Sequence, residues 1–269
     1  MNLPTVRKAA GIAYRESGSS TSPAVVLLHG IGSTSAGWRD QYGPLGERYR
    51  VLAWSAPGYH DSAPLAPESP SAQDYARALA AWLDAVGARE AHLVTNSWGT
   101  LVALAFASAF PGRARSLALG GPTAGSHGLS EAQRAKLAAD RIARVHGVGL
   151  QAMREQDAPR LVAPGAPAHV VQWVIHAVPG EGPTAEGYCQ AARMLYSVDG
   201  VALVGGLDQR ILVVSGAQDV VTPPERNARP LAAAARNAQF VSIDACGHLP
   251  HLEKPERFNA LVLDFLGAS

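Results

Sequence analysis

The sequence predicts an α/β fold, in which a mostly parallel sheet is flanked by helices. The first observation is a set of short, unbroken apolar runs rich in Val, Ile and Leu, at residues 24–29, 50–55, 91–96, 115–120, 210–216 and 239–244. The second is that helical patterns separate several of these runs. Unbroken apolar runs are typical of strands buried on both faces, and their alternation with helices indicates parallel connections.

Five segments of the predicted core have a helical pattern, at residues 37–48, 71–86, 98–110, 224–236 and 255–266. Two of them begin with recognisable start signals. Ser71 stands at the N-cap position before Ala72, and Pro255 occupies the first turn before Glu256. These signals fix where two of the helices that flank the sheet begin.

Residues 122–206 interrupt this alternation because they contain no convincing strand. Helical patterns at residues 130–146, 168–178 and 184–197 are separated there by Pro- and Gly-containing loops at 158–167 and 179–183. We therefore expect an inserted, all-helical cap at residues 122–206. The sheet domain would then consist of residues 1–121 and 207–269.

Composition favours a globular protein whose partner is a small molecule. The chain has 269 residues, with Lys+Arg 23, Asp+Glu 22 and a net charge of +1, so it has no broad basic field for nucleic acid or anionic lipid. The two cysteines, Cys189 and Cys246, cannot build a disulfide framework, and residues 1–11 lack the apolar stretch of a secretory signal. We expect a cytoplasmic monomer or homodimer with a small-molecule substrate.

Three polar residues follow predicted strands in an order that indicates nucleophilic catalysis. Ser97 lies where a strand ends and a helix begins, Asp219 follows the 210–216 strand, and His248 follows the 239–244 strand. A nucleophilic serine needs a base to take its proton and a carboxylate to fix the tautomer of that base. Because the carboxyl ends of parallel strands share one edge, these three side chains can converge there.

These residues belong to a longer ordered set of motifs through which the sequence resembles the α/β-hydrolase fold family, over nearly the whole chain outside the cap. The motifs are His29-Gly30-Ile31-Gly32, Ala56-Pro57-Gly58-Tyr59-His60-Asp61-Ser62, Asn96-Ser97-Trp98-Gly99, Asp219, and Gly247-His248 with Glu253-Lys254-Pro255-Glu256. The resemblance implies that Ser97 is the nucleophile, His248 the general base and acid, and Asp219 the orienting carboxylate. It also implies an oxyanion hole formed by the backbone amides of Ile31 and Trp98, with no cofactor and no metal.

The sequence departs from the family pattern at three positions. Thr95 stands where glycine is usual two residues before the nucleophile, Ser55 where an aspartate is common, and His60 where glycine is common. None of these positions belongs to the triad. The departures are nevertheless compatible with a catalytically weak member of the family or with one whose pocket mouth is reshaped.

Several other polar residues have a structural interpretation beside a functional one. Asp244 is a rival to Asp219 but ends a strand, which favours a turn residue. His29 is expected to brace the oxyanion loop rather than act as a base. His251 is expected to pack or lie at the surface, and the sequence shows no third ligand that would make it a metal site.

Candidate substrate-binding residues are Asn96, beside the nucleophile, and Trp173 and Arg193 in the cap. Related lactonases and carbon–carbon hydrolases often hold a substrate carboxylate with a cap arginine, which draws attention to Arg193. His176, Tyr188, Met194 and Tyr196 are further candidates for the pocket beneath the cap, although residues at helical spacing are more often core.

The leading prediction is a cofactor-independent serine hydrolase that acts on a small ester, lactone or related carbonyl compound, with transfer to an acceptor other than water left open. Two alternatives remain. Asn96 is shared with the subgroup that hydrolyses vinylogous diketones from aromatic ring cleavage, but Leu249 stands where that subgroup commonly has tryptophan. The other alternative is a ligand-binding protein with a weakly active triad. Ser97 argues against the aspartate-nucleophile branches of the fold, which are epoxide hydrolases and haloalkane dehalogenases.

Overall fold

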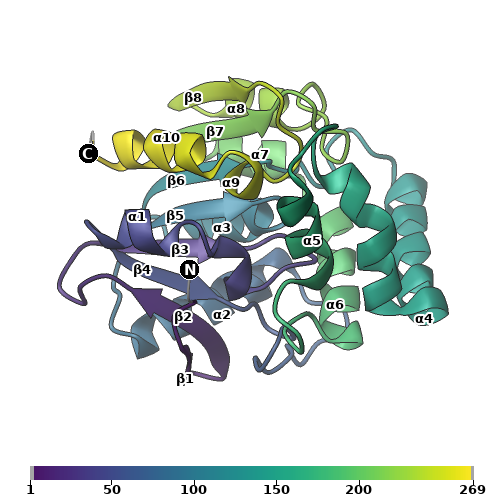
Figure 1. Cartoon of the computed structure of the whole chain (residues 1–269), viewed down its shortest axis with the longest axis horizontal. Helices are drawn as coiled ribbons and strands as arrows, with labels where there is room; N and C mark the ends of the chain where they lie inside the picture. Colours follow the sequence, from purple (N-terminus) through teal and green to yellow (C-terminus); the bar gives the residue numbers. More distant parts are fainter. Residues whose placement is uncertain (1–2, 268–269) are drawn as a thin grey trace.

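The computed structural model describes residues 3–267 and contains one eight-stranded, mostly parallel sheet (Figure 1). The strand order is β1-β2-β4-β3-β5-β6-β7-β8, in which β3 to β8 pair in parallel. This confirms the predicted fold class. The bounds of these six strands are Ala24–Leu28, Arg50–Trp54, Ala91–Asn96, Ala114–Gly120, Arg210–Gly216 and Ala238–Ile243, for β3 to β8 in turn.

Sequence analysis did not predict the first two strands, which are antiparallel. β1 (Val6–Ala9) pairs with β2 (Ile12–Ser17), and β2 pairs with β4. Two of the four β1 residues, Arg7 and Lys8, are exposed, so the segment lacks a continuous apolar run. An edge strand of this kind is held by backbone pairing more than by burial, and hydropathy alone does not indicate it.

The helices of the core lie on both faces of the sheet. α2 (Ala72–Ala85) begins at the predicted cap, where the Ser71 hydroxyl accepts a hydrogen bond from the Asp74 amide. α3 (Gly99–Ala109), α7 (Gly200–Gly205) and α8 (Ala228–Ala234) pack into the same apolar cluster as α2. On the other face, α1 (Tyr42–Gly46) and α10 (Pro255–Gly267) form a second cluster that includes Trp38 and Phe258.

Two predicted core helices are shorter than expected. The 37–48 segment forms a 3-10 turn, η1 (Ser35–Trp38), followed by α1, because three glycines and a proline within it disfavour a continuous helix. The 224–236 helix is α8 alone, since Pro223 and Pro224 precede it in a turn. A short helix, α9 (Pro250–Glu253), precedes α10.

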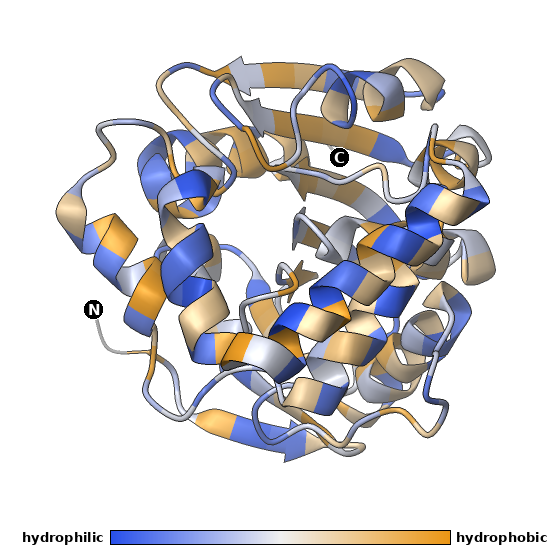
Figure 2. Cartoon of the chain, turned by 90° about the vertical axis from the view of Figure 1, so that its right-hand side faces the viewer, coloured by the Kyte–Doolittle hydropathy of each residue, from blue (hydrophilic) through white to orange (hydrophobic). Residues whose placement is uncertain are grey.

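The chain between β6 and β7 is helical, and all of it except its last short helix lies beside the sheet, at the right of Figure 1. It contains α4 (Glu131–Leu161), α5 (Ala168–His176), α6 (Ala185–Ser197) and α7, which is consistent with the predicted cap, although α7 itself packs against α3 and α8 of the core. The predicted helix at 130–146 corresponds to the first part of α4, which is broken at Gly149, where φ is +80° and ψ is 164°; the second helical stretch, which runs to Leu161, was not predicted. Figure 2 shows hydrophilic and hydrophobic residues alternating along these helices, as expected for helices packed on one side only.

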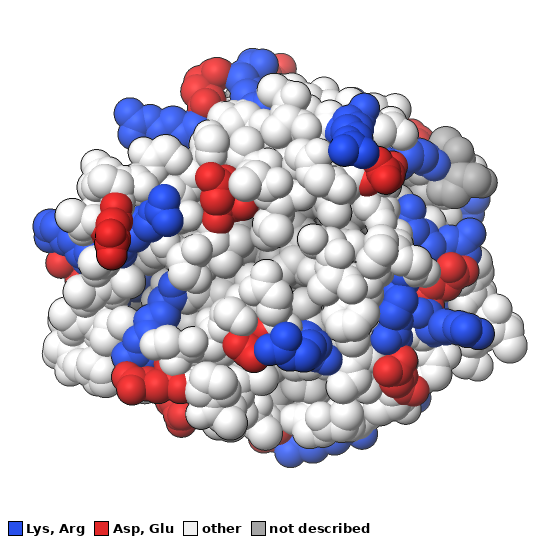
Figure 3. Space-filling model, turned by 180° about the vertical axis from the view of Figure 1, so that it is seen from behind, with Lys and Arg blue, Asp and Glu red and all other residues white. Residues whose placement is uncertain are grey.

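The surface carries both signs of charge without a dominant patch on the face shown in Figure 3, where most atoms belong to uncharged residues. None of the helices within residues 3–267 combines the length and the hydropathy that crossing a bilayer requires.

Candidate active site

Ser97 lies in a sharp turn between β5 and α3. Its φ is +52°, a left-handed conformation that is rare for a non-glycine residue and typical of a nucleophile at a strand-to-helix elbow. The backbones meet closely there, because a Cβ added to Gly99 would lie 2.3 Å from the Leu28 carbonyl oxygen. Gly99 therefore allows the turn that presents the Ser97 side chain to the cavity beneath the cap.

Thr95 fits on the other side of this elbow without disturbing it. It is fully buried, and its hydroxyl lies 3.1 Å from the hydroxyl of Thr100 on α3, so the two groups satisfy each other. A glycine is thus not required at this position in this chain. The structure also explains why glycine is common at the position of His60. His60 adopts a φ of +51°, which glycine adopts more easily than histidine does.

His248 and Asp219 form a buried pair at the ends of β8 and β7. His248 Nδ1 lies 2.9 Å from Asp219 Oδ2, and both residues are 3% exposed. An ionised carboxylate only accepts hydrogen bonds, so Nδ1 of His248 carries the proton and Nε2 is left as the acceptor. This is the tautomer that a general base needs.

Thr222 completes the set of donors around Asp219. The Asp219 Oδ1 atom accepts the amides of Val221 at 2.8 Å and Thr222 at 2.9 Å, while the Thr222 hydroxyl donates to Oδ2 at 2.7 Å. Burial on its own disfavours the carboxylate, but hydrogen bonds from His248 and Thr222 outweigh it and hold the pKa of Asp219 below its ordinary value. Asp219 therefore stays ionised at neutral pH.

Two further side chains fix the loop that carries His248. The Glu253 carboxylate accepts the amides of Gly247 at 3.0 Å, Leu249 at 3.2 Å and Ala163 at 2.7 Å, and so binds the residues on both sides of the histidine. Asn96 donates its side-chain amide to the His248 carbonyl at 3.2 Å. The loop is thereby tied to the cap and to the strand that carries Ser97.

Ser97 and His248 line one cavity of about 420 Å³ beneath the cap. No hydrogen bond joins the two side chains within the described part of the chain, and such bonds often tighten only when substrate binds. Asp244, the rival acid, is exposed and does not line this cavity. The geometry thus brings His248 together with Asp219 rather than with Asp244.

The backbone amides of Ile31 and Trp98 are free to bind an anion, because neither donates a hydrogen bond to any residue between 3 and 267. Hydrogen bonds to the Gly30 carbonyl oxygen fix the orientation of the peptide group between Gly30 and Ile31. The Gly30 oxygen accepts the Ser33 amide at 3.0 Å and lies 2.8 Å from His29 Nδ1. In a trans peptide the Ile31 N–H then points the opposite way.

His29 braces this loop, as the sequence predicted. Its Nε2 accepts the Ala56 amide at 3.0 Å, so the proton is on Nδ1 and is donated to the Gly30 carbonyl. Burial lowers the pKa of His29 to about 4, so the ring is neutral at pH 7 and keeps this tautomer.

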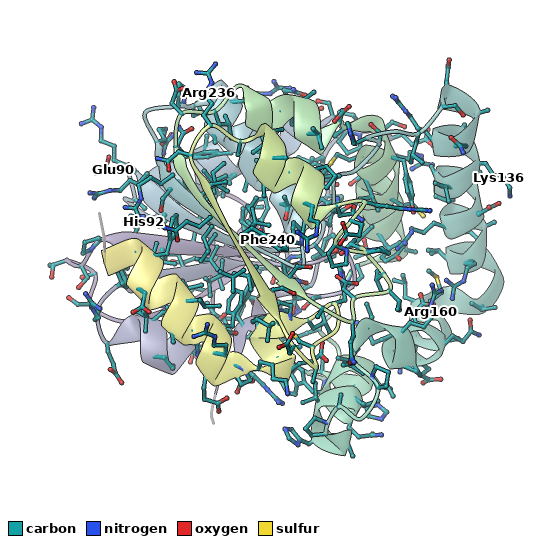
Figure 4. All side chains as sticks on the ribbon, turned by 90° about the horizontal axis from the view of Figure 1, so that it is seen from above. Glu90, His92, Lys136, Arg160, Arg236 and Phe240 are labelled. Carbon is teal, nitrogen blue, oxygen red and sulfur yellow. The ribbon has the colours of Figure 1, made fainter. Side chains whose placement is uncertain are left out.

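The remaining buried histidines lie in different surroundings. His251 packs between Trp38 and Phe258 and lines the cavity, and burial, together with the nearby His248, lowers its pKa to about 3. His92 lies at the end of β5 away from the cap, hydrogen-bonded to Ser116 at 2.7 Å (Figure 4). Among residues 3–267 no group of three or more His, Cys, Asp or Glu could hold a metal ion.

Some of the predicted substrate-binding residues line the cavity and others lie away from it. Asn96 and Trp173 line the cavity, and the Trp173 ring lies 4.3 Å from the guanidinium of Arg39. Tyr188 and Tyr196 also line it, whereas His176 and Met194 do not. The α6 residues that line the cavity are Tyr188 and, about two turns further along the same face of the helix, Leu195 and Tyr196.

Arg193, the predicted carboxylate-binding residue of the cap, does not line the cavity. This arginine lies off the cavity face of α6 and pairs with Glu68, whose Oε1 atom is 3.0 Å from its Nη2 atom. The cavity is lined instead by arginines of α4, which sequence analysis did not single out: Arg141, Arg144, Arg154 and Arg160. No sequence signal distinguishes them, because arginine in a strongly polar helix is usually solvated.

Comparisons with known proteins agree with this architecture. The model of the alpha/beta hydrolase family matches residues 25–261. A 2-hydroxy-6-oxo-6-phenylhexa-2,4-dienoate hydrolase of Comamonas testosteroni is 27% identical over 95% of this chain and 91% of its own length. A thermophilic esterase from Thermogutta terrifontis is 25% identical, with a TM-score of 0.85 over 99% of this chain and 98% of its own. The enol-lactonase of Burkholderia xenovorans LB400, 23% identical, shares the fold with a TM-score of 0.83 over 98% of this chain and 100% of its own.

The sheet, the elbow and the cap define an α/β hydrolase. Since the family match spans most of the sequence, the chain belongs to the alpha/beta hydrolase family.

Proposed function

We propose that the protein is a serine hydrolase of small esters or lactones, in which Ser97, His248 and Asp219 form the catalytic triad. The observation that carries this proposal is the combination of a left-handed Ser97 at a strand-to-helix turn with a buried His248–Asp219 pair, in which Ser97 and His248 line one cavity. In this arrangement a hydroxyl nucleophile and its oriented base can meet the same carbonyl group.

The acylation step follows from the tautomer of His248. Its Nε2 takes the proton of the Ser97 hydroxyl while Oγ forms a bond to the substrate carbonyl carbon. The carbonyl oxygen becomes an oxyanion, which the amides of Ile31 and Trp98 stabilise, each by about 3–4 kcal/mol. As the intermediate collapses, the bond to the leaving oxygen breaks and the proton on Nε2 passes to that oxygen, leaving an acyl group on Ser97.

Deacylation repeats these steps with water. His248 takes a proton from the water molecule, the resulting hydroxide attacks the acyl carbon, and the proton then returns to Ser97 Oγ as the acid departs. Asp219 stays ionised throughout and stabilises the transient imidazolium. The cap helices cover the cavity and contribute Trp173, Tyr188 and Tyr196 to its wall, so they would select the substrate.

Hydrolysis of a carbon–carbon bond is the second candidate. It is supported by the relatives named as dienoate and dienedioate hydrolases, which are 27% and 28% identical over nearly the whole chain. Asn96 beside the nucleophile is shared with that subgroup. Leu249 after His248, in place of the subgroup's usual tryptophan, favours the ester or lactone as the principal substrate.

Turnover by matched variants tests the proposal. Wild-type protein, Ser97→Ala and the control Ser197→Ala, which alters an exposed serine at the end of α6, are assayed with p-nitrophenyl hexanoate, dihydrocoumarin and 2-hydroxy-6-oxo-6-phenylhexa-2,4-dienoate. We expect Ser97→Ala to lower kcat/KM for the ester and the lactone by about a thousandfold or more, while Ser197→Ala leaves it unchanged.

Other outcomes separate the alternatives. If only the dienoate is cleaved, carbon–carbon hydrolysis replaces the first proposal. If wild-type protein turns over none of the three substrates, a ligand-binding role takes its place.

A further inference from the structure

The loop that carries His248 is covered by the chain that leaves the first cap helix. The His248 amide donates a hydrogen bond to the carbonyl oxygen of Leu161, the last residue of α4, at 3.1 Å. The two backbones lie so close that a Cβ added to Gly247 would be 2.6 Å from the Ala163 nitrogen. Residues 161–163, which we call the strap, therefore run directly against the backbone of the histidine loop.

Apolar side chains hold the strap in this place. Val162 is 6% exposed and belongs to one buried cluster with Val170 of α5 and Leu252 of α9. Leu249, which follows His248 in the sequence, packs against the same cluster. Burial of these side chains favours the docked strap, because undocking would return their apolar surface to water.

Glu253 joins the strap to the histidine loop through its carboxylate. Its Oε1 atom accepts the amides of Gly247 at 3.0 Å and Leu249 at 3.2 Å, while Oε2 accepts those of Ala163 at 2.7 Å and Gly247 at 3.0 Å. Each oxygen thus accepts two N–H groups, which matches the acceptor capacity of a carboxylate. Since Glu253 is 7% exposed, water does not readily replace a bond that is lost.

These contacts fix the backbone from which the His248 side chain projects. Three consecutive amides are held, because Glu253 accepts those of Gly247 and Leu249 and the strap accepts that of His248. The imidazole then meets Asp219 at 2.9 Å. A catalytic group that is displaced by about 1 Å can lose about a hundredfold in rate, so the support of this backbone bears directly on catalysis.

We propose that Glu253 is a positioning residue for His248 and that the strap is its second support, so that the general base is in place only while this part of the cap is docked. The inference rests on the proposed function, in which His248 is the general base. The cap then does more than enclose the substrate, because its docking also prepares the base for proton transfer.

Replacing Glu253 with glutamine keeps the shape of the side chain but places an NH2 group opposite amides that need an acceptor. With p-nitrophenyl hexanoate, we expect Glu253→Gln to lower kcat by about tenfold to a hundredfold and to change KM by less than about twofold. Glu256→Gln, at an exposed residue of α10, is the matched control and should leave both constants unchanged. An unchanged kcat, or a loss that lies in KM alone, would overturn the positioning role.

A double-mutant cycle separates positioning from a general loosening of the fold. If Glu253 acts through His248, the Glu253→Gln, His248→Gln variant should hydrolyse the ester within about twofold of the rate of His248→Gln alone. A further loss of about tenfold in the double variant would show that Glu253 supports the fold or the substrate instead, and would overturn the proposal.

Ala163→Pro tests the strap, since proline lacks the amide proton that Glu253 accepts. Val162, with φ −123° and ψ 160°, already has a backbone conformation that residues before proline adopt. We expect kcat to fall by about threefold to tenfold, without adding to the loss in Glu253→Gln. This variant leaves every side chain of the histidine loop in place, so it also tests the proposal should Glu253→Gln not fold. An unchanged kcat would overturn the dependence on the cap.

Proton NMR at low field gives a readout that does not depend on turnover, because it detects the Nδ1–H that His248 donates to Asp219. We expect the signal in wild-type protein and in Glu256→Gln, and its loss or broadening in Glu253→Gln and Ala163→Pro. If no ester is hydrolysed but the signal depends on Glu253, the proposed function fails alone. A signal that is absent from wild-type protein, or unchanged in Glu253→Gln, overturns the positioning role.

Discussion

The hydroxyl of Thr222 connects the two buried members of the candidate triad. It donates to Asp219 Oδ2 at 2.7 Å and lies 3.0 Å from His248 Nδ1. Since Thr222 holds the carboxylate that orients the histidine, it acts as a positioning residue. Its contribution would be to keep Asp219 in one rotamer and ionised while His248 gains and loses a proton.

Replacing Thr222 with valine removes this hydroxyl at nearly constant volume. We expect kcat to fall about fivefold to tenfold, which corresponds to about 1 kcal/mol, with KM nearly unchanged, because one hydrogen bond to a charged group is lost. Steady-state kinetics with p-nitrophenyl hexanoate measure this effect. Thr222→Ser keeps the hydroxyl and should restore most of the rate; a serine variant as slow as the valine variant would argue against the role of the hydroxyl.

At the residue scale, sequence predicted what short-range patterns determine. Ser97, Asp219 and His248 follow strands that meet at one edge of a parallel sheet, so their positions along the chain indicate where they converge. Arg193 and Arg141 show the limit of this reasoning. Which face of a cap helix looks into the cavity depends on how the helices pack, and both arginines occur in sequences that permit either orientation.

At the element scale, the start of α6 docks on the loop after β4 through two glycines. A Cβ added to Gly187 would lie 2.2 Å from the Gly58 carbonyl oxygen. The same oxygen accepts the amide of Thr184 at 2.9 Å and its hydroxyl at 3.0 Å. This close approach anchors the cap to the core next to Tyr59, whose hydroxyl bonds the Ile31 carbonyl at 2.9 Å.

Gly187→Ala should therefore loosen the cap. The added methyl group cannot be accommodated without moving α6 away from the backbone of Gly58, so we expect the free energy of unfolding to fall by about 1–3 kcal/mol and KM to rise. Urea denaturation and substrate titration measure the two effects. Gly147→Ala is the control, because Gly147 is an exposed residue of α4 with open space around it, and alanine there should stabilise the helix slightly. Equal behaviour of the two variants would contradict the docking role of Gly187.

The elements themselves were predictable where their signals are local. The Ser71 cap, the Pro255 start and six parallel strands agree with the sequence pattern. β1 is held mainly by pairing with β2, and a second helical stretch of α4 follows the break at Gly149 and packs with α5 and α6. Hydropathy in a short window indicates neither feature, because β1 contains two charged residues and no apolar run, and the part of α4 after Gly149 packs on helices that follow later in the chain.

At the scale of the whole molecule, neutral buried histidines make stability depend on pH. Burial lowers the pKa of His29 to about 4, and lowers that of His251, next to the positive charge that His248 can carry, to about 3. The unfolded chain, in which histidine titrates near its ordinary value of about 6.5, then binds more protons than the folded chain in this interval. The contribution of these two histidines to the free energy of unfolding is therefore fully present above about pH 6.5. It is lost as the pH decreases toward the pKa values that they have in the folded protein.

His251→Gln tests this account. Each fully buried histidine contributes at most about 1.4 kcal/mol per pH unit to the slope, so the variant should lose less stability than wild type between pH 6.5 and 4. Urea denaturation at pH 7.5, 5.5 and 4.5 gives the slopes. His176→Gln, at an exposed histidine of α5, should behave as wild type. A His251→Gln slope as steep as that of wild type would show that acid acts elsewhere.

The central claim concerns the whole constellation, namely that Ser97 is a nucleophile activated by His248. The most direct measurement is the intact mass of the folded protein after incubation with a serine-directed fluorophosphonate, with the modified peptide then identified. We predict one adduct on Ser97, no adduct on Ser97→Ala, and much slower labelling of His248→Gln. A folded wild-type protein that gains no adduct, or an adduct that persists in Ser97→Ala, would contradict the claim.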